Sequence, residues 1–229
     1  MQSDAGSSGR RGGLSTLLGR SRSAGRTRPA PRPVRTHSSR WAIARPYATI
    51  ALVVASVGMW IATRAEPALA LHTMVIGPLD GDWWRIFTYQ FAYFEGGGGG
   101  VYAFVAILAT GLFGWLLERR HGPAVVLGLF LGAGAVGALV ADAVYADPFL
   151  AGANAGALAL LAAWAAPDLR ALRRGEFYEG DLLGAGAFAA LLLAIPFARP
   201  EASWLAGVIG GLLGLTVGLG LTGMAEREG

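Results

Sequence analysis

The chain has 229 residues, of which 54% are hydrophobic and only 15% are charged, and its mean hydropathy is +0.48. A soluble domain usually carries about 25% charged residues, and here long uncharged runs separate the charges, so the composition excludes an ordinary soluble domain and indicates a polytopic membrane protein. The sequence contains no Cys, which excludes disulfides, thiolate metal sites and a cysteine nucleophile. Gly makes up 35 of the 229 residues, well above the usual ~7%, and in membrane helices such a Gly content favours close backbone packing.

Residues 1–45 differ in composition from everything that follows. They hold ten of the nineteen Arg residues, a single acidic residue, Asp4, and many Ser, Gly and Pro, and the chain has no Lys at all. Such a segment cannot bury enough apolar surface to fold alone. We therefore expect a disordered, Arg-rich cytoplasmic tail at 1–45 that helps to set membrane topology. An organelle transit peptide and a contact with anionic lipid stay open as alternatives.

Six apolar segments follow within residues 46–225, which we expect to form one membrane domain. Their expected positions are about 47–63, 101–117, 123–141, 148–167, 182–198 and, for the sixth, within 202–225. The fourth, 148–167, carries no charge, and at ~1.5 Å per residue it is just long enough to cross the ~30 Å apolar core of a bilayer. The sequence therefore predicts an all-α membrane protein with six transmembrane helices, and a loop at 168–181 that carries Arg170, Arg173 and Arg174.

The fourth segment contains one polar side chain, Asn154, among Gly and Ala residues. A lone amide in an apolar span is costly unless it finds a hydrogen-bond partner. We expect Asn154 to bond across to the sixth segment, either to the carbonyls exposed beside Gly207 and Gly210 or to the indole of Trp204. The alternative is an Asn that faces an outer aqueous cavity and contributes little.

The long connection after the first segment, residues 64–100, is strongly aromatic, which is typical of a loop that lies in the lipid headgroup layer. Its aromatic residues are Trp83, Trp84, Phe87, Tyr89, Phe91, Tyr93 and Phe94. Five glycines, Gly96–Gly100, end the loop and predict a flexible hinge.

The distribution of Arg predicts the orientation. With both termini in the cytoplasm, sixteen Arg residues lie on the inner side and three, Arg64, Arg85 and Arg199, on the outer side. The positive-inside rule then places both termini in the cytoplasm of what we expect to be a bacterial plasma membrane.

Few side chains suit catalysis or metal binding. The three histidines, His37, His72 and His121, lie outside the spans, and no two have the spacing of metal ligands, so we expect neither a metal nor a cofactor. Ser56 and Ser203 are the serines in or beside a span, and neither has a base nearby in the sequence. We expect Glu118 to lie at a helix end that water reaches.

Glycines four residues apart predict a tight contact between the fourth and sixth segments, because residues at that spacing share a helical face. In the sixth segment they are Gly207 and Gly211, and Gly210, Gly214 and Gly218. The expected partner face carries Gly152 and Gly156.

Taken together, these features resemble the rhomboid family of intramembrane serine proteases. The pair Trp84-Arg85 in WWRIFTYQF is similar to the family's loop motif, and the run from Gly114 to Glu118 (GWLLE) is similar to the end of its second span. The resemblance covers about residues 47–222. It implies a six-helix core, a membrane-embedded first loop and a Gly-rich sixth span packed on the fourth.

The sequence departs from the family at the positions that carry catalysis. Active rhomboids use a Ser in the fourth span, within Gly-x-Ser-Gly, and a His in the sixth. That Ser position falls on Asn154 or Ala155, depending on which Gly is aligned, and the His position falls near Trp204 or Gly207.

The resemblance extends to the oxyanion site, and there too the expected residues are missing. The family's His and Asn on the second span fall on Tyr102 and Ala106, and its Phe-x-His at the end of the loop reads Phe91-Ala92-Tyr93. An amide cannot replace a serine hydroxyl as nucleophile, and no imidazole is available as base.

Three functions remain open on the sequence. The first is a rhomboid pseudoprotease that binds the transmembrane segments of client proteins. Membrane lipid is its other expected partner, and we expect it to bind neither nucleic acid nor a small-molecule cofactor. The second is an active intramembrane serine endopeptidase, as the family resemblance alone would imply. The third is a small transporter-like protein, against which stands the lack of charges within the spans.

Overall fold

The computed structural model describes residues 45–94 and 99–228, so the predicted tail lies almost wholly outside the described residues. Six long or apolar helices form the bundle: α1 (Tyr47–Ala65), α4 (Gly99–His121), α5 (Pro123–Val144), α6 (Asn154–Arg174), α7 (Leu182–Ala198) and α8 (Trp204–Glu228). The connections contain the short helices α2 (Pro67–Thr73) and α3 (Arg85–Thr88), the 3₁₀ turns η1 (Tyr89–Phe91) and η2 (Pro200–Ala202), and the strands β1 (Val75–Ile76) and β2 (Phe149–Leu150). The all-α architecture predicted from the sequence is confirmed.

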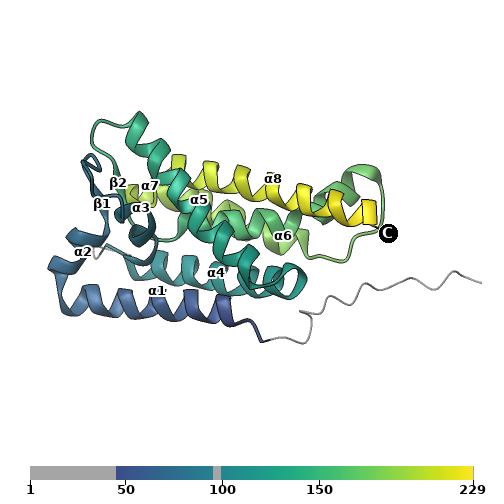
Figure 1. Cartoon of the computed structure of the whole chain (residues 1–229), viewed down its shortest axis with the longest axis horizontal. Coiled ribbons are helices and arrows are strands. Elements are labelled where there is room, and N and C mark those ends of the chain that lie inside the picture. Colours follow the sequence, from purple (N-terminus) through teal and green to yellow (C-terminus); the bar gives the residue numbers. More distant parts are fainter. Residues whose placement is uncertain (1–44, 95–98, 229) are drawn as a thin grey trace, which may run out of the picture. The chain divides into compact units, whose positions relative to one another are not determined.

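Helix α6 lies at the centre of the bundle. It contacts α4, α5, α7 and α8, while α1 packs beside α4 at the edge (Figure 1). Among the five longest helices α6 is also the most buried, because its many Ala side chains let its neighbours approach on every side.

The closest of these contacts is the seam between α6 and α8, which we define by three residue pairs. Gly210 of α8 lies against the carbonyl of Ala155, Gly214 against that of Ala159, and Gly218 against that of Ala163. A Cβ atom on Gly218 would be only 2.6 Å from the oxygen of Ala163. The backbones of the two helices therefore touch at every turn along this face.

The sequence identified the correct face of α8 and the wrong face of α6. Gly207 lies against Asn154 and Leu158. Gly211 is at the margin of the seam, where an added Cβ atom would lie 4.0 Å from the Cβ of Leu158. The two glycines expected as partners face elsewhere: Gly156 packs on Phe130 and Gln90, and Gly152 packs on Tyr102. An Ala methyl group is small enough for close helix contact, so the partner face needed no glycine.

The boundaries of the fourth span were also predicted wrongly. Residues 148–153 form β2 and a turn, in which Gly152 has φ +85°, so the helix begins at Asn154. It then runs through Pro167 to Arg174, so Arg170, Arg173 and Arg174 lie in its last turns and not in a loop. Pro167 has no amide hydrogen for the carbonyl of Ala163, and this is the carbonyl that Gly218 approaches.

Glu118 is buried, which corrects the expectation that water reaches it. Its carboxylate accepts hydrogen bonds from the backbone amides of Ala48 (3.0 Å) and Thr49 (2.8 Å) and from the Thr49 hydroxyl (2.6 Å). These amides belong to the first turn of α1, where unpaired N–H groups and the helix dipole favour a negative charge. Gly114, one turn earlier on α4, lets Thr49 approach. The GWLLE run thus joins α4 to the start of α1.

The number of spans is the remaining question. Within residues 45–94 and 99–228, five helices are long and apolar enough to cross a membrane: α1, α4, α5, α6 and α8. Helix α7 is apolar and has 17 residues, which at ~1.5 Å per residue falls slightly short of a ~30 Å core. The sixth span therefore stays a prediction. Of the predicted hinge, Gly99 and Gly100 instead form the first turn of α4, and Gly96–Gly98 lie outside the described residues.

We predict that Gly214→Ala destabilises the protein, because the new Cβ would collide with the carbonyl oxygen of Ala159 and push the two helices apart. The expected loss is about 1–3 kcal/mol of unfolding free energy in mixed micelles. The matched control is Gly220→Ala on the same helix, where an added Cβ meets nothing described within 4 Å. That variant should be neutral or slightly more stable. Equal stabilities for the two variants would show that the seam is not a close backbone contact.

Candidate functional site

Asn154 is the first residue of α6, and its side chain is buried with 1% of its surface exposed. Its Nδ2 donates a hydrogen bond to the carbonyl oxygen of Ala202 at 3.0 Å. Ala202 ends η2, the turn directly before α8. The bond therefore joins α6 to the approach to α8, although the partner is not one of the carbonyls or the indole that the sequence suggested.

The residue of α8 that faces Asn154 is Gly207. A Cβ atom on Gly207 would lie 2.7 Å from Nδ2 of Asn154, whereas Trp204 has 57% of its surface exposed. Ser203, the residue before α8, has φ +40° and its hydroxyl accepts a hydrogen bond from the amide of Ala206 at 3.3 Å. The Ser203 hydroxyl therefore caps α8.

Two buried tyrosines occupy the positions where the resemblance placed histidines. The rings of Tyr93 and Tyr102 meet edge to face with their centroids 5.5 Å apart. The Tyr102 hydroxyl donates to the carbonyl of Ala151 at 3.0 Å, and the absence of a side chain at Gly152 makes room for the Tyr102 ring. Burial raises the pKa of Tyr93, so this phenol stays neutral and protonated at physiological pH.

The other two candidate positions are closed by helix packing. Ala106 is fully buried, and its carbonyl accepts a hydrogen bond from the Thr110 hydroxyl at 2.8 Å. The carbonyl of Ala155 is covered by Gly210 of α8. The methyl side chains of Ala106 and Ala155 cannot donate a hydrogen bond to Asn154.

The sequence gave no role to Tyr89 and Gln90, which also lie beneath the loop. The Tyr89 hydroxyl donates to the carbonyl of Gly134 at 2.9 Å, and the backbone carbonyl of Tyr89 accepts a hydrogen bond from the amide of Gly152 at 2.8 Å. Gln90 is fully buried and lies against Gly134 and Gly156. The only sequence signal was a polar residue within an aromatic run, and nothing in that run shows which glycines make room for it.

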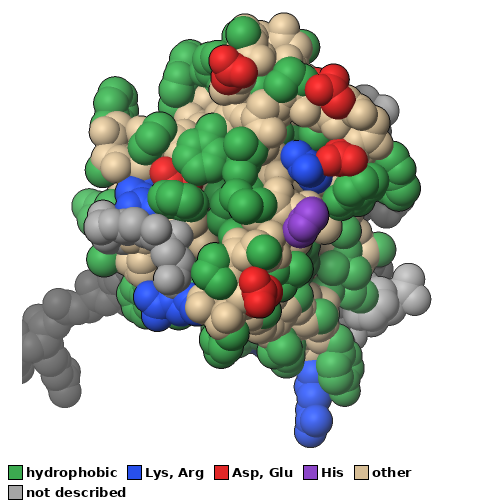
Figure 2. Space-filling view, turned by 90° about the vertical axis from the view of Figure 1, so that its left-hand side faces the viewer, with side chains coloured by type: hydrophobic (Ala, Val, Ile, Leu, Met, Phe, Trp, Pro, Cys, Tyr) green, Lys and Arg blue, Asp and Glu red, His purple; other side chains and the backbone are tan. Residues whose placement is uncertain are grey.

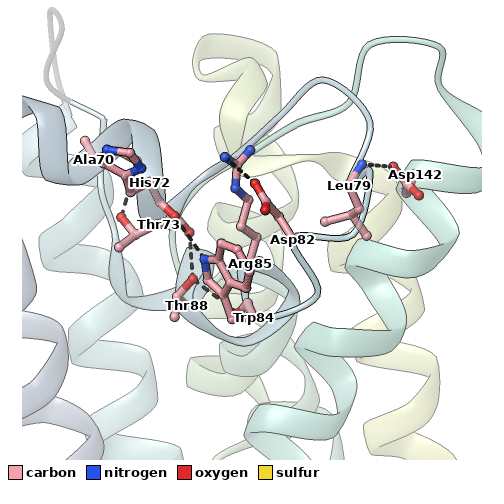
Figure 3. A network of polar contacts seen from close by, with 9 residues as sticks. All are labelled: Ala70, His72, Thr73, Leu79, Asp82, Trp84, Arg85, Thr88 and Asp142. Carbon is pink, nitrogen blue, oxygen red and sulfur yellow. Dashed lines mark hydrogen bonds and ion pairs between the residues drawn. The ribbon is translucent and has the colours of Figure 1, made fainter.

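The loop motif Trp84-Arg85 lies in a network of polar contacts (Figure 3). The indole Nε1 of Trp84 donates to the carbonyl of His72 at 3.4 Å, and Arg85 forms an ion pair with Asp82 at 2.7 Å. Two further bonds hold the loop to its neighbours: the Thr88 hydroxyl donates to the carbonyl of Thr73 at 2.9 Å, and the Leu79 amide donates to Asp142 at 3.0 Å. The motif thus keeps the loop against α2, while Asp142 ties it to α5.

A strand pair joins the same loop to the start of α6. Val75 pairs with Leu150 and Ile76 with Phe149 in antiparallel register. On the other side, the Ala151 amide donates to the carbonyl of Glu201 at 2.8 Å. The Glu201 carboxylate is itself buried against Arg199. Residues 149–154 are therefore held from both sides.

The described residues near Asn154 can be compared with what acyl transfer requires. Such a reaction needs a nucleophile, a base within hydrogen-bond reach and donors for the oxyanion. The Asn154 amide bonds to the carbonyl of Ala202 and lies against Gly207, which also contacts Leu158, and the described residues include no group of three His, Asp or Glu that could hold a metal ion.

Comparison with known families gives one clear match. A family model described as "Rhomboid domain" matches residues 80–223, which is more than half of the chain and runs from the first loop to α8. A search of curated proteins finds no match.

We predict that Asn154→Ala lowers the unfolding free energy in mixed micelles by about 1 kcal/mol, because it leaves the buried carbonyl of Ala202 without its donor. Asn154→Leu should cost more, since Leu adds bulk where Gly207 touches the side chain. If both variants match the parent protein within error, the bond to Ala202 contributes nothing to stability.

Proposed function

Because this chain belongs to the rhomboid family, we propose that it is a pseudoprotease, which binds transmembrane segments of client proteins without cleaving them. The observation that carries the proposal is the state of Asn154. The resemblance places the family's nucleophile at Asn154 or Ala155, neither of which has a hydroxyl, and the Asn154 side chain is buried with its amide bonded to the carbonyl of Ala202.

The chemistry of the replacing groups supports inactivity. The nitrogen of an amide has its lone pair delocalised, so Asn154 cannot attack a peptide carbonyl as a serine oxygen does. Tyr102 and Tyr93, which replace imidazoles, are weak bases, and the raised pKa of Tyr93 keeps its proton bound. Losing the nucleophile or the base of a serine protease typically costs on the order of 10⁶ in turnover.

Helix α7 supports a role in binding. Among its residues only Ala185 and Leu192 are buried, and Leu183 and Phe197 are almost fully exposed. One edge-to-face contact, between Phe188 and Phe113 of α4 with centroids 5.6 Å apart, links it to the neighbouring helix. A loosely packed apolar helix of this kind leaves room for a client's transmembrane helix to pack beside α4.

We further expect both termini to lie in the cytoplasm, as the Arg distribution indicates. A reporter fused after Arg174 should then be cytoplasmic, and one fused near Asp147 external.

The purified protein should neither cleave a helix-destabilised transmembrane substrate nor react with a serine-directed fluorophosphonate probe. The control is Ser203→Ala, which removes the serine that directly precedes α8 and caps it. Probe labelling that is specific and disappears in Ser203→Ala would identify an active serine protease instead.

Client binding is tested by the recovery of single-span proteins that co-purify with this protein from membranes. Recovery should fall when Trp84→Ala and Arg85→Ala loosen the loop, and equal recovery would count against client binding.

A further inference from the structure

A pocket of about 210 Å³ opens at the end of the bundle that carries the strand pair. Its walls come from four elements, and they include Tyr145 after α5, Asp147 and Phe149 at β2, Pro200 of η2 and Trp204 at the start of α8. Figure 2 looks onto this end of the bundle and shows hydrophobic side chains beside acidic ones. We call this site the Asp147 pocket.

Among the described residues that line the pocket, Asp147 alone is charged. Its carboxylate is exposed, and it forms no hydrogen bond or ion pair with any of the residues 45–94 and 99–228 that are described. The other acid of this connection, Asp142, is by contrast engaged by the Leu79 amide. The pocket thus presents one uncommitted negative charge beside aromatic rings.

None of the described Arg residues lines this pocket. Arg199, the Arg closest in sequence to Trp204, forms an ion pair with Glu201 and donates to the carbonyl of Phe94 at 3.1 Å. Elsewhere the chain does place Arg over Trp: the guanidinium of Arg64 lies 5.1 Å from the ring centroid of Trp60. Trp204 has more than half of its surface exposed, so its ring is open to a cation from another molecule.

An aromatic wall and a carboxylate together select a cation. The face of an aromatic ring attracts ammonium and guanidinium groups, and Trp does so most strongly. Arg adds planar, multiple donors that suit a carboxylate. An apolar side chain would gain nothing from Asp147, and an anion would be repelled by it.

The pocket also lies close along the chain to Asn154 and to the Ala202 carbonyl that binds it. Trp204 lies two residues after Ala202, whose carbonyl binds Asn154, and Phe149 lies five residues before Asn154. A segment that leaves a client's transmembrane helix at this end of the bundle would pass the pocket. We propose that the Asp147 pocket binds one Arg or Lys side chain in the segment that flanks the client's transmembrane helix. This inference rests on the proposed function and names the feature by which clients are selected.

The test uses two sets of synthetic probes on the full-length protein. The first is a water-soluble peptide that carries one Arg, compared with the same peptide carrying citrulline, which keeps the shape and removes the charge. The second is a single-span peptide in nanodiscs with Arg or citrulline in its flank. Binding of the soluble peptide is followed by the fluorescence of Trp204, isolated by subtracting the signal of Trp204→Phe.

Two isosteric variants provide the matched comparison. Asp147→Asn removes the pocket's charge, and Asp142→Asn makes the same change to the neighbouring acid that lies outside the pocket and contacts the Leu79 amide. Thermal unfolding of each variant establishes that it is folded before binding is measured.

We expect the Arg peptide to quench Trp204 saturably and to bind about tenfold more tightly than the citrulline peptide, with the advantage lost in Asp147→Asn and kept in Asp142→Asn. If Arg and citrulline single-span peptides bind equally well, the pocket inference is overturned while client binding stands. If no single-span peptide binds but the soluble Arg peptide still does so through Asp147, the pocket takes a cation but the proposed client function is overturned. Absence of Arg-selective quenching in the parent protein overturns the pocket itself.

Discussion

The structure depends on one contact above all, the backbone seam between α6 and α8. Gly210, Gly214 and Gly218 bring α8 against the carbonyls of three Ala residues one turn apart on α6. In a membrane, helices gain little from burying apolar surface against each other, so close van der Waals contact of this kind is a main source of association. The seam fixes the height of α8 along α6, and this in turn sets Gly207 against Asn154 and brings the Ala202 carbonyl within reach of its amide.

At the loop end of the bundle, the surrounding elements contact the residues that lead into α6. β1 pairs with β2, the Tyr89 carbonyl holds the amide of Gly152, and the Tyr102 hydroxyl holds the carbonyl of Ala151. Each of these bonds satisfies a backbone group that would otherwise be buried without a partner, which is costly in an apolar setting. In this region, to which the resemblance assigns the catalytic serine, two phenols and an amide bond to the backbone.

The sequence predicted most of the helices, but less of how the residues around the start of α6 are arranged. Long uncharged runs located the helices, and glycines spaced by four identified the face of α8 that packs on α6. Hydropathy could not show that residues 148–153 form a strand and a turn, because an uncharged run of Ala, Gly and Leu looks the same in a strand and a helix. The absence of charge placed the end of the fourth segment at residue 167, but the helix continues to Arg174, and Gly218 of a distant helix covers the carbonyl that Pro167 leaves without an amide partner. The burial of Glu118 was missed for a related reason: its partners are amides about seventy residues earlier in the chain.

The proposed inactivity can be tested most directly by placing a hydroxyl at residue 154. Asn154→Ser supplies a nucleophile at the start of α6, yet the described surroundings contain no imidazole to activate it. Treated with a fluorophosphonate probe, Asn154→Ser should be labelled no more than the parent protein, with Asn154→Ala as the matched background. Labelling of Asn154→Ser that Asn154→Ala lacks would reveal a working base beside residue 154 and would contradict the proposed inactivity.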